Sequence, residues 1–165
     1  MAIVQLTARK GREADLVASL ARVTGLSLPQ AGHTSQARDL AAVAFGPGTW
    51  LVMEPWRAQP ELAQILRTAC GNAAAVVDQT GGKTVLQIAG KHARRVLAKG
   101  CRIDLHPRVF GPDRVAVTSV AHINMAVVQR DDAPTFDLIM GSTFAATFLE
   151  WLEMSAAEFG YVLGG

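Results

Sequence analysis

The segment 86–107 constrains the fold more than any other part of this sequence. Residues 84–89 are rich in apolar and β-branched side chains, which predicts a strand, and Gly90 follows it directly. Residues 91–98 then place Ala93, Val96 and Leu97 on one side of a short helix, and the segment ends in a polar turn at 104–107. A strand joined through a glycine to a helix and a turn requires a fold in which helices pack on a sheet.

The rest of the chain alternates between strand and helix patterns in the same way. Leu16, Leu20 and Val23 share one face of a helix, and the Gly46-Pro47-Gly48 turn joins two short apolar runs as a hairpin would. The predicted strands are 2–8, 40–45, 49–54, 74–79, 84–89, 115–120, 122–129, 136–140 and a short one at 159–163. The predicted helices are 13–23, 59–70, 91–98 and a last one capped by Ser142 or Thr143. Residues 28–37, rich in Pro, Gly, Ser and Thr, are predicted to form a surface loop.

This order of elements predicts an α+β fold. Each half of the chain has the approximate order β-α-β-β-α-β, which is the split βαβ unit of ferredoxin-like folds. We therefore expect one domain over residues 1–165, built from two such halves, 1–80 and 83–165, packed together.

The composition favours a protein that buries part of its surface against a partner. Half of the residues are hydrophobic and only 18% are charged, and soluble monomers seldom expose large apolar patches. A net charge of +2 does not indicate nucleic acid or a membrane surface as the partner. The N-terminus lacks the pattern of a signal peptide, and no apolar run is long enough to span a bilayer. Cys70 and Cys101 have no nearby cysteine, so they predict free thiols in a cytoplasmic protein.

Histidines offer the first candidates for chemistry. His92, Asp104 and His106 are close enough in sequence to suggest acid–base catalysis, but an Asp and a His in a turn more often accept hydrogen bonds from the turn's own backbone. We favour that structural role. The spacing of His33, His92, His106 and His122 matches no metal motif. Gly90 opens a helix that could attract an anion, but a lone glycine is better explained by the sharp turn. We predict no catalytic, cofactor-binding or metal-binding residue in this chain.

Lys91, Arg94, Arg95 and Lys99 form a basic cluster, which we interpret as a solvated helix face.

Two other parts of the chain suggest contact with a partner. Trp56 and Arg57 lie in a connecting loop, and these residue types are enriched at interfaces. The run that contains Met125 is apolar on both faces, so this strand is either central in a sheet or covered by another chain. We therefore predict Trp56, Arg57 and Met125 as interface residues.

Several of these segments together carry a family resemblance. They are the run 85–107, the following strand pair through His122 and Val127, the end of the chain at 142–152, and the earlier Gly46-Pro47-x-x-Trp50-Leu51 pattern. In order and spacing they resemble the γ subunit of heterotetrameric sarcosine oxidase. They are more distantly similar to the folate-binding domain of glycine-cleavage aminomethyltransferases. The resemblance covers nearly the whole chain and implies the α+β fold that the periodicity predicts.

The resemblance also implies a set of partners. In that family, a large α subunit, a flavin-bearing β subunit and a zinc-bearing δ subunit accompany the γ subunit. Such a complex demethylates sarcosine to glycine, passes formaldehyde to tetrahydrofolate, and uses FAD, FMN, NAD and zinc as well. None of these cofactors is expected in the γ chain, which would be a structural subunit. Two alternatives remain: a stand-alone folate-binding or one-carbon transfer protein, and the equivalent subunit of another N-methyl amino-acid oxidase or dehydrogenase.

Overall fold

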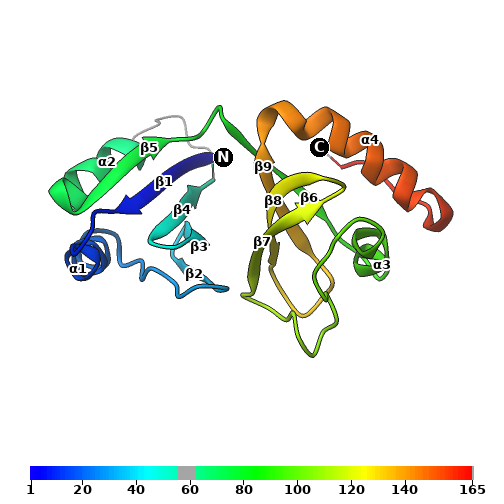
Figure 1. The fold of residues 1–165 in the computed structure, drawn as a ribbon, viewed down its shortest axis with the longest axis horizontal. Coiled ribbons are helices and arrows are strands. Elements are labelled where there is room, and N and C mark those ends of the chain that lie inside the picture. The colour runs from blue at the N-terminus through cyan, green and yellow to red at the C-terminus, as the bar shows by residue number, and fades with distance from the viewer. Residues whose placement is uncertain (56–61, 165) are drawn as a thin grey trace. The chain divides into compact units, whose positions relative to one another are not determined.

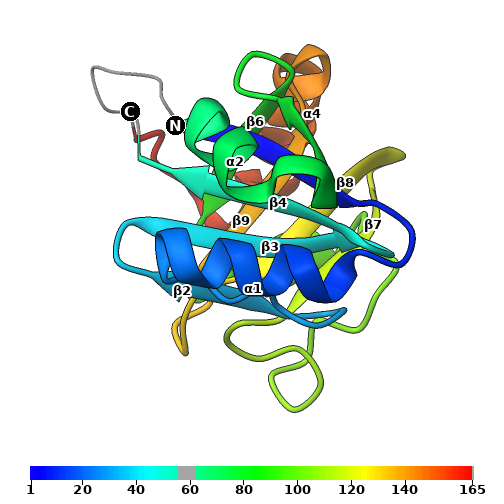
Figure 2. The same ribbon diagram turned by 90° about the vertical axis from the view of Figure 1, so that its left-hand side faces the viewer.

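The computed structural model describes residues 1–55 and 62–164. The chain divides into two compact units, Met1–Gly81 and Gly82–Gly165. Each unit contains an antiparallel sheet with two α-helices packed on one face (Figures 1 and 2). The predicted α+β class is confirmed. None of the helices in the described part of the chain combines the length and apolarity that a membrane crossing requires.

The first unit is a five-stranded sheet in the order β2-β3-β4-β1-β5. Its strands are β1 (Ala2–Ala8), β2 (Thr34–Ala37), β3 (Leu40–Gly46), β4 (Thr49–Glu54) and β5 (Ala74–Asp78). Its helices are α1 (Glu13–Thr24) and α2 (Leu62–Cys70), with a short 3-10 helix η1 (Gly71–Ala73) after α2. Without β2, this unit has the predicted order β-α-β-β-α-β of a ferredoxin-like fold.

Alternation along β1 builds the core of the first unit. Val4 and Leu6 point to the same face of the sheet and are fully buried, because successive side chains of a strand point to opposite faces. Leu16 and Leu20, one helical turn apart on α1, pack against that face. Gly25 ends α1 in the left-handed conformation (φ 73°), which glycine adopts without a steric penalty.

The second unit is a four-stranded sheet in the order β6-β9-β8-β7. Its strands are β6 (Lys83–Ile88), β7 (Val115–Val120), β8 (Ile123–Gln129) and β9 (Phe136–Gly141). Its helices are α3 (Ala93–Ala98) and α4 (Ala145–Ala156), with 3-10 helices η2 (Ser142–Phe144) and η3 (Ala157–Phe159) at the two ends of α4. The chain order is β-α-β-β-β-α, so α4 follows β9 and completes the unit.

Three predicted details are wrong. Residues 34–37 form strand β2 instead of loop: their polar composition hides the strand, but they pair with β3 at the sheet edge, where polar side chains are tolerated. Residues 159–163 form no strand, because η3 ends at Phe159 and no regular structure follows. Neither Ser142 nor Thr143 caps α4, since both lie within η2 and the N-cap is Phe144, which makes no side-chain cap.

The backbone of Gly100 lies close to other groups of the second unit. A Cβ at this position would lie 2.6 Å from Cζ2 of Trp151 and 3.0 Å from the backbone nitrogen of Ala121. Trp151 cannot yield freely, because its ring packs against Phe148 with centroids 5.4 Å apart in the core of the unit. The turn after α3 therefore tolerates only glycine here.

We predict that Gly100→Ala destabilises the protein by about 1–3 kcal/mol, the usual cost of overpacking. Gly81→Ala is the matched control, since a Cβ there meets nothing within 4 Å and its φ is not positive. That control should leave stability unchanged or raise it by up to about 1 kcal/mol. Urea denaturation of both variants measures the difference, and equal midpoints would contradict the close approach.

Candidate functional site

The segment 86–107 folds as the sequence predicts but brings no catalytic pair together. Strand β6 ends at Ile88, Gly90 takes a φ of 111°, and α3 begins at Ala93. Only glycine adopts that φ readily, so Gly90 has the turn role favoured from the sequence. The polar residues that follow make contacts within the second unit, which we describe one group at a time.

Arg94 lies at the centre of the largest of these groups. Its Nη1 donates hydrogen bonds to the carbonyl oxygens of Leu105 and Phe110, the second at 3.2 Å. Its Nη2 donates to Oε1 of Gln129 at 2.9 Å, and the guanidinium lies 5.0 Å from the ring centroid of Phe136. Partial removal from water lowers the pKa of the Arg94 guanidinium, but an arginine remains charged at neutral pH. Arg94 thus ties α3 to the loop that follows it and to the end of β8.

Gln129 completes this network from the sheet side. Its side chain is 1% exposed, and its Nε2 donates to the carbonyl oxygen of Asp131 at 2.9 Å. Buried Asp137 is paired in a similar way, since it accepts a hydrogen bond from Gln87 at 3.0 Å and lies 3.4 Å from Arg130. These buried polar groups have partners, as stability requires.

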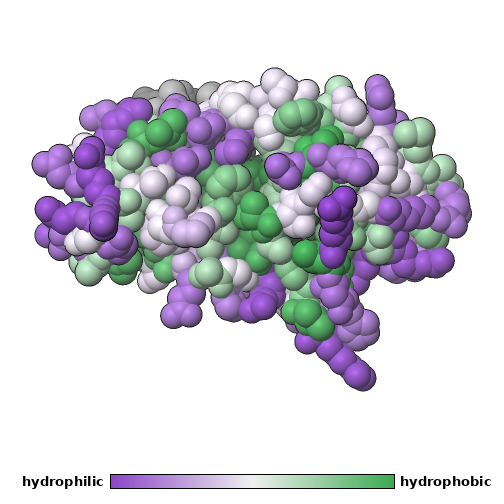
Figure 3. All heavy atoms as spheres, viewed as in Figure 1, coloured by the Kyte–Doolittle hydropathy of each residue, from purple (hydrophilic) through white to green (hydrophobic). Residues whose placement is uncertain are grey.

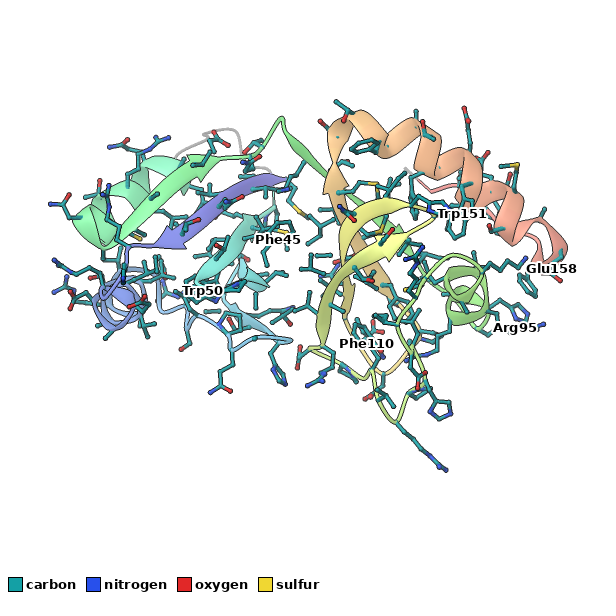
Figure 4. The ribbon with its side chains drawn as sticks, in the orientation of Figure 1. Phe45, Trp50, Arg95, Phe110, Trp151 and Glu158 are labelled. Carbon is teal, nitrogen blue, oxygen red and sulfur yellow. The ribbon has the colours of Figure 1, made fainter. Side chains whose placement is uncertain are left out.

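A second group joins α3 to the end of α4. The ring of Phe159 stacks on His92 with centroids 4.6 Å apart, and Arg95 and Lys99 lie 4.7 Å and 5.2 Å from its centroid. Lys99 also pairs with Glu158 at 2.5 Å, and its hydrogen bond lowers the pKa of the Glu158 carboxyl. Figure 4 shows Arg95 and Glu158 at the same end of the unit. The basic cluster is therefore not simply a solvated helix face: Arg94 points inward, and Arg95 and Lys99 hold Phe159.

Asp104 and His106 take the turn role that the sequence favoured. The backbone N–H of His106 donates to Oδ1 of Asp104 at 2.8 Å, and the N–H of Arg108 donates to Nδ1 of His106 at 3.2 Å. Both side chains use an acceptor atom to fix the loop backbone. Nδ1 of His92 is buried and accepts or donates no hydrogen bond among the described residues; this ring is held by its stacking on Phe159.

The other candidates are dispersed. His33 and His122 are exposed, and the described residues contain no group of three or more His, Cys, Asp or Glu side chains placed to hold a metal ion. Cys70 and Cys101 are free, and burial raises the pKa of both thiols. A raised pKa keeps a thiol protonated and unreactive at neutral pH.

The predicted interface residues have different outcomes. Trp56 and Arg57 lie outside the described residues. Met125 is 1% exposed and belongs to the core of the second unit, and its strand β8 is an interior strand of the sheet. Of the two alternatives for this apolar strand, β8 is a central strand of a sheet, and Met125 is buried by residues of its own unit. Its side chain therefore offers no surface to a partner. Trp50 packs against the core of the first unit and donates from Nε1 to the carbonyl oxygen of Pro29 at 2.9 Å.

A shallow groove lies between α1 and α2 in the first unit. It has a volume of about 410 Å³ and is lined by Arg22, Val23, Gln64, Ile65, Thr68 and Ala69. A neighbouring hollow of about 360 Å³ on α1 contains Arg12 and Asp15, which pair with each other at 2.6 Å. The lining of the groove offers no carboxylate or histidine as a base, and in the hollow the carboxylate of Asp15 is paired with Arg12 instead of with the hydroxyl of Ser19, so neither has the makeup of an active site.

We predict that Arg94→Met destabilises the protein by about 3 kcal/mol, because each buried acceptor left unpaired costs about 1–3 kcal/mol. Hydrogen exchange should accelerate in the loop that carries Leu105 and Phe110. Arg102→Met is the control, since Arg102 is exposed and makes no side-chain hydrogen bond or ion pair in the described structure. Equal thermal stability of the two variants would contradict a structural role for Arg94.

Comparison with known proteins connects this fold to a family. Residues 10–158 match the model of the sarcosine oxidase, gamma subunit family. The sarcosine oxidase subunit gamma of Corynebacterium sp. (strain U-96) is 34% identical over 150 residues, covering 86% of this chain and 71% of that protein. The subunit of the same name from Arthrobacter sp is 30% identical over 144 residues, covering 86% and 70%.

A solved structure is similar over a still larger part of the chain. A chain of the heterotetrameric sarcosine oxidase from Corynebacterium sp. U-96, in complex with pyrrole 2-carboxylate, matches with a TM-score of 0.84 and 28% identity. The match covers 99% of this chain and 83% of that one. Sequence and fold agree over nearly the whole length, and the chain belongs to the sarcosine oxidase gamma subunit family.

Proposed function

We propose that this chain is the γ subunit of a heterotetrameric sarcosine oxidase. Its role is to stabilise the assembled complex, and the catalytic residues lie on other subunits. The observation that carries the proposal is the structural match over 99% of the chain to a chain of such an enzyme. Family membership over residues 10–158 supports it independently. A fold by itself does not define a function, but here fold, sequence and subunit name agree.

The role of the polar side chains supports a non-catalytic subunit. Arg94 donates to two backbone carbonyls and to Gln129, and Asp104 and His106 accept from turn backbone. Side chains held in this way stabilise the fold. Among the described residues these side chains therefore make structural contacts. Catalysis would instead need a nucleophile and a base placed together in a cleft.

The proposal extends to the partners and to the reaction of the whole complex. An α subunit, a flavin-bearing β subunit and a zinc-bearing δ subunit would complete the tetramer. Together they would demethylate sarcosine to glycine and pass formaldehyde to tetrahydrofolate, with FAD, FMN and NAD held outside this chain. Another N-methyl amino acid is the alternative substrate. The free thiols of Cys70 and Cys101 fit a cytoplasmic complex, since disulfides are rare there.

Co-expression tests the subunit role. When this chain is produced with the α, β and δ subunits of its own organism and the α subunit is tagged, we expect it to elute in equimolar amount with a flavin-containing complex. Size-exclusion chromatography with mass determination measures the stoichiometry. Recovery of the chain as a flavin-free monomer beside an otherwise complete complex would contradict the proposal.

A titration with tetrahydrofolate separates this role from that of a stand-alone folate-binding protein. Such a protein would need a free buried carboxylate to meet the pterin ring. Asp137 is the buried carboxylate among the described residues, and Gln87 and Arg130 already occupy its oxygens. We therefore expect a flat calorimetric trace with the isolated chain. Saturable heat would instead favour folate binding.

A further inference from the structure

The basic residues of this chain are distributed unevenly. Residues 91–108 contain six of the 16 lysines and arginines of the chain but only one of its 14 acidic residues. The six cations are Lys91, Arg94, Arg95, Lys99, Arg102 and Arg108. The small net charge of the whole protein therefore conceals a strong local excess on α3 and the loop that follows it.

Five of these six cations are exposed, and we call them the α3 basic surface: Lys91, Arg95, Lys99, Arg102 and Arg108. Only Arg94 points inward, where it holds the loop. Asp104 and Glu158 are the carboxylates on or beside this surface, and Glu158 pairs with Lys99. Glu150 and Glu153 of α4 form no ion pair with these cations in the described structure. In Figure 3, hydrophilic residues gather around α3 and along the loop below it.

The α3 basic surface is held in place by contacts within the second unit. Arg94 bonds to Leu105 and Phe110, so the loop that carries Arg102 and Arg108 lies beside α3. The ring of Phe159 lies under the guanidinium of Arg95, 4.7 Å from its centroid. A cation–π contact leaves the N–H donors of an arginine free to bond elsewhere. The side chains of Arg95 and Lys99 are therefore held before any partner arrives, and the anchored loop fixes the backbone positions of Arg102 and Arg108; both lower the entropic cost of binding.

We propose that the α3 basic surface is the docking site for an acidic surface on another subunit of the complex, an inference that rests on the proposed function. Arginine is enriched at protein interfaces because its planar fork binds carboxylates through two hydrogen bonds. Exposed Val109 (56%), next to Arg108, adds an apolar contact of the kind that interfaces bury. Complementary charge across such an interface fixes the orientation of the subunits and accelerates their association.

An acidic protein surface fits these residues better than nucleic acid does. Single-stranded nucleic acid is bound by basic grooves with exposed aromatic rings on which bases stack. The aromatic ring beside this surface belongs to Phe159, and it already contacts His92, Arg95 and Lys99. The surface therefore offers carboxylate-binding donors without a stacking platform.

Charge reversal at residues without a structural contact tests the proposal. Lys91→Glu/Arg108→Glu inverts two cations of the α3 basic surface whose side chains form no hydrogen bond or ion pair within the described structure. Arg9→Glu/Lys10→Glu is the control, because it makes the same change of net charge at two exposed residues of the first unit. Each variant is mixed with the complex of the other three subunits, and the association rate is measured at about 0.05 M and about 0.5 M NaCl.

We expect the α3 double variant to associate about tenfold more slowly than the wild type at low salt, since electrostatic steering raises association rates at least tenfold. The difference should shrink at high salt, and the control should stay within about twofold of the wild type. Equal slowing of both variants, no slowing of either, or loss of bound nucleic acid from the α3 variant alone would overturn the proposal. If the wild type itself fails to associate, the proposed function fails and this inference with it. Circular dichroism confirms that both variants fold.

Discussion

The contact of Arg94 with two loop carbonyls and a buried glutamine is the interaction on which the second unit depends. It joins the side of helix α3 to the middle of the loop before β7 and to the end of β8. The far end of that loop is also joined to β8 by backbone hydrogen bonds between Asp113, Arg114 and Gln129. That loop contains no helix or strand from Arg102 to Asp113, and the carbonyls of Leu105 and Phe110 take their donor from the side chain of Arg94. A guanidinium carries five N–H donors in one plane and can serve several acceptors at once, which a lysine cannot do in the same geometry.

Other polar residues of the same segment also stabilise the fold. The residue types that suggested acid–base chemistry, Asp104 and His106, serve the loop that Arg94 anchors. Their hydrogen bonds fix the backbone on which Arg108 is exposed. Arg94, which points inward, and the exposed Asp104 and His106 thus shape the loop, while the exposed lysines and arginines form a charged surface.

Periodicity predicted most of the regular elements but missed an edge strand and assigned a strand wrongly near residue 160. Strand β1 and helix α1 were recognisable because alternation and the Leu16/Leu20 spacing record which face is buried. Strand β2 was missed because an edge strand is stabilised by backbone pairing with β3, and backbone hydrogen bonds leave no mark on side-chain composition. The apolar run at 159–163 resembled a strand, but it pairs with no strand, and the ring of Phe159 packs on His92 and Arg95 beside α3 instead.

The sequence contains one indication that an arginine of the basic cluster points inward. Arg94 and Arg95 are adjacent on a helix and differ in direction by about 100°, so only one can flank the buried stripe of Ala93, Val96 and Leu97 on the side facing the loop. Composition does not say which one, since the acceptors are mostly backbone carbonyls, which every residue has. Gln129 is the exception. It continues the alternation of Met125 and Val127 onto the core face, where an amide with no partner would be costly. A polar side chain that the alternation places on the buried face of a strand needs a hydrogen-bond partner from the helices that cover this face. An arginine beside the apolar stripe of such a helix is long enough to donate that hydrogen bond.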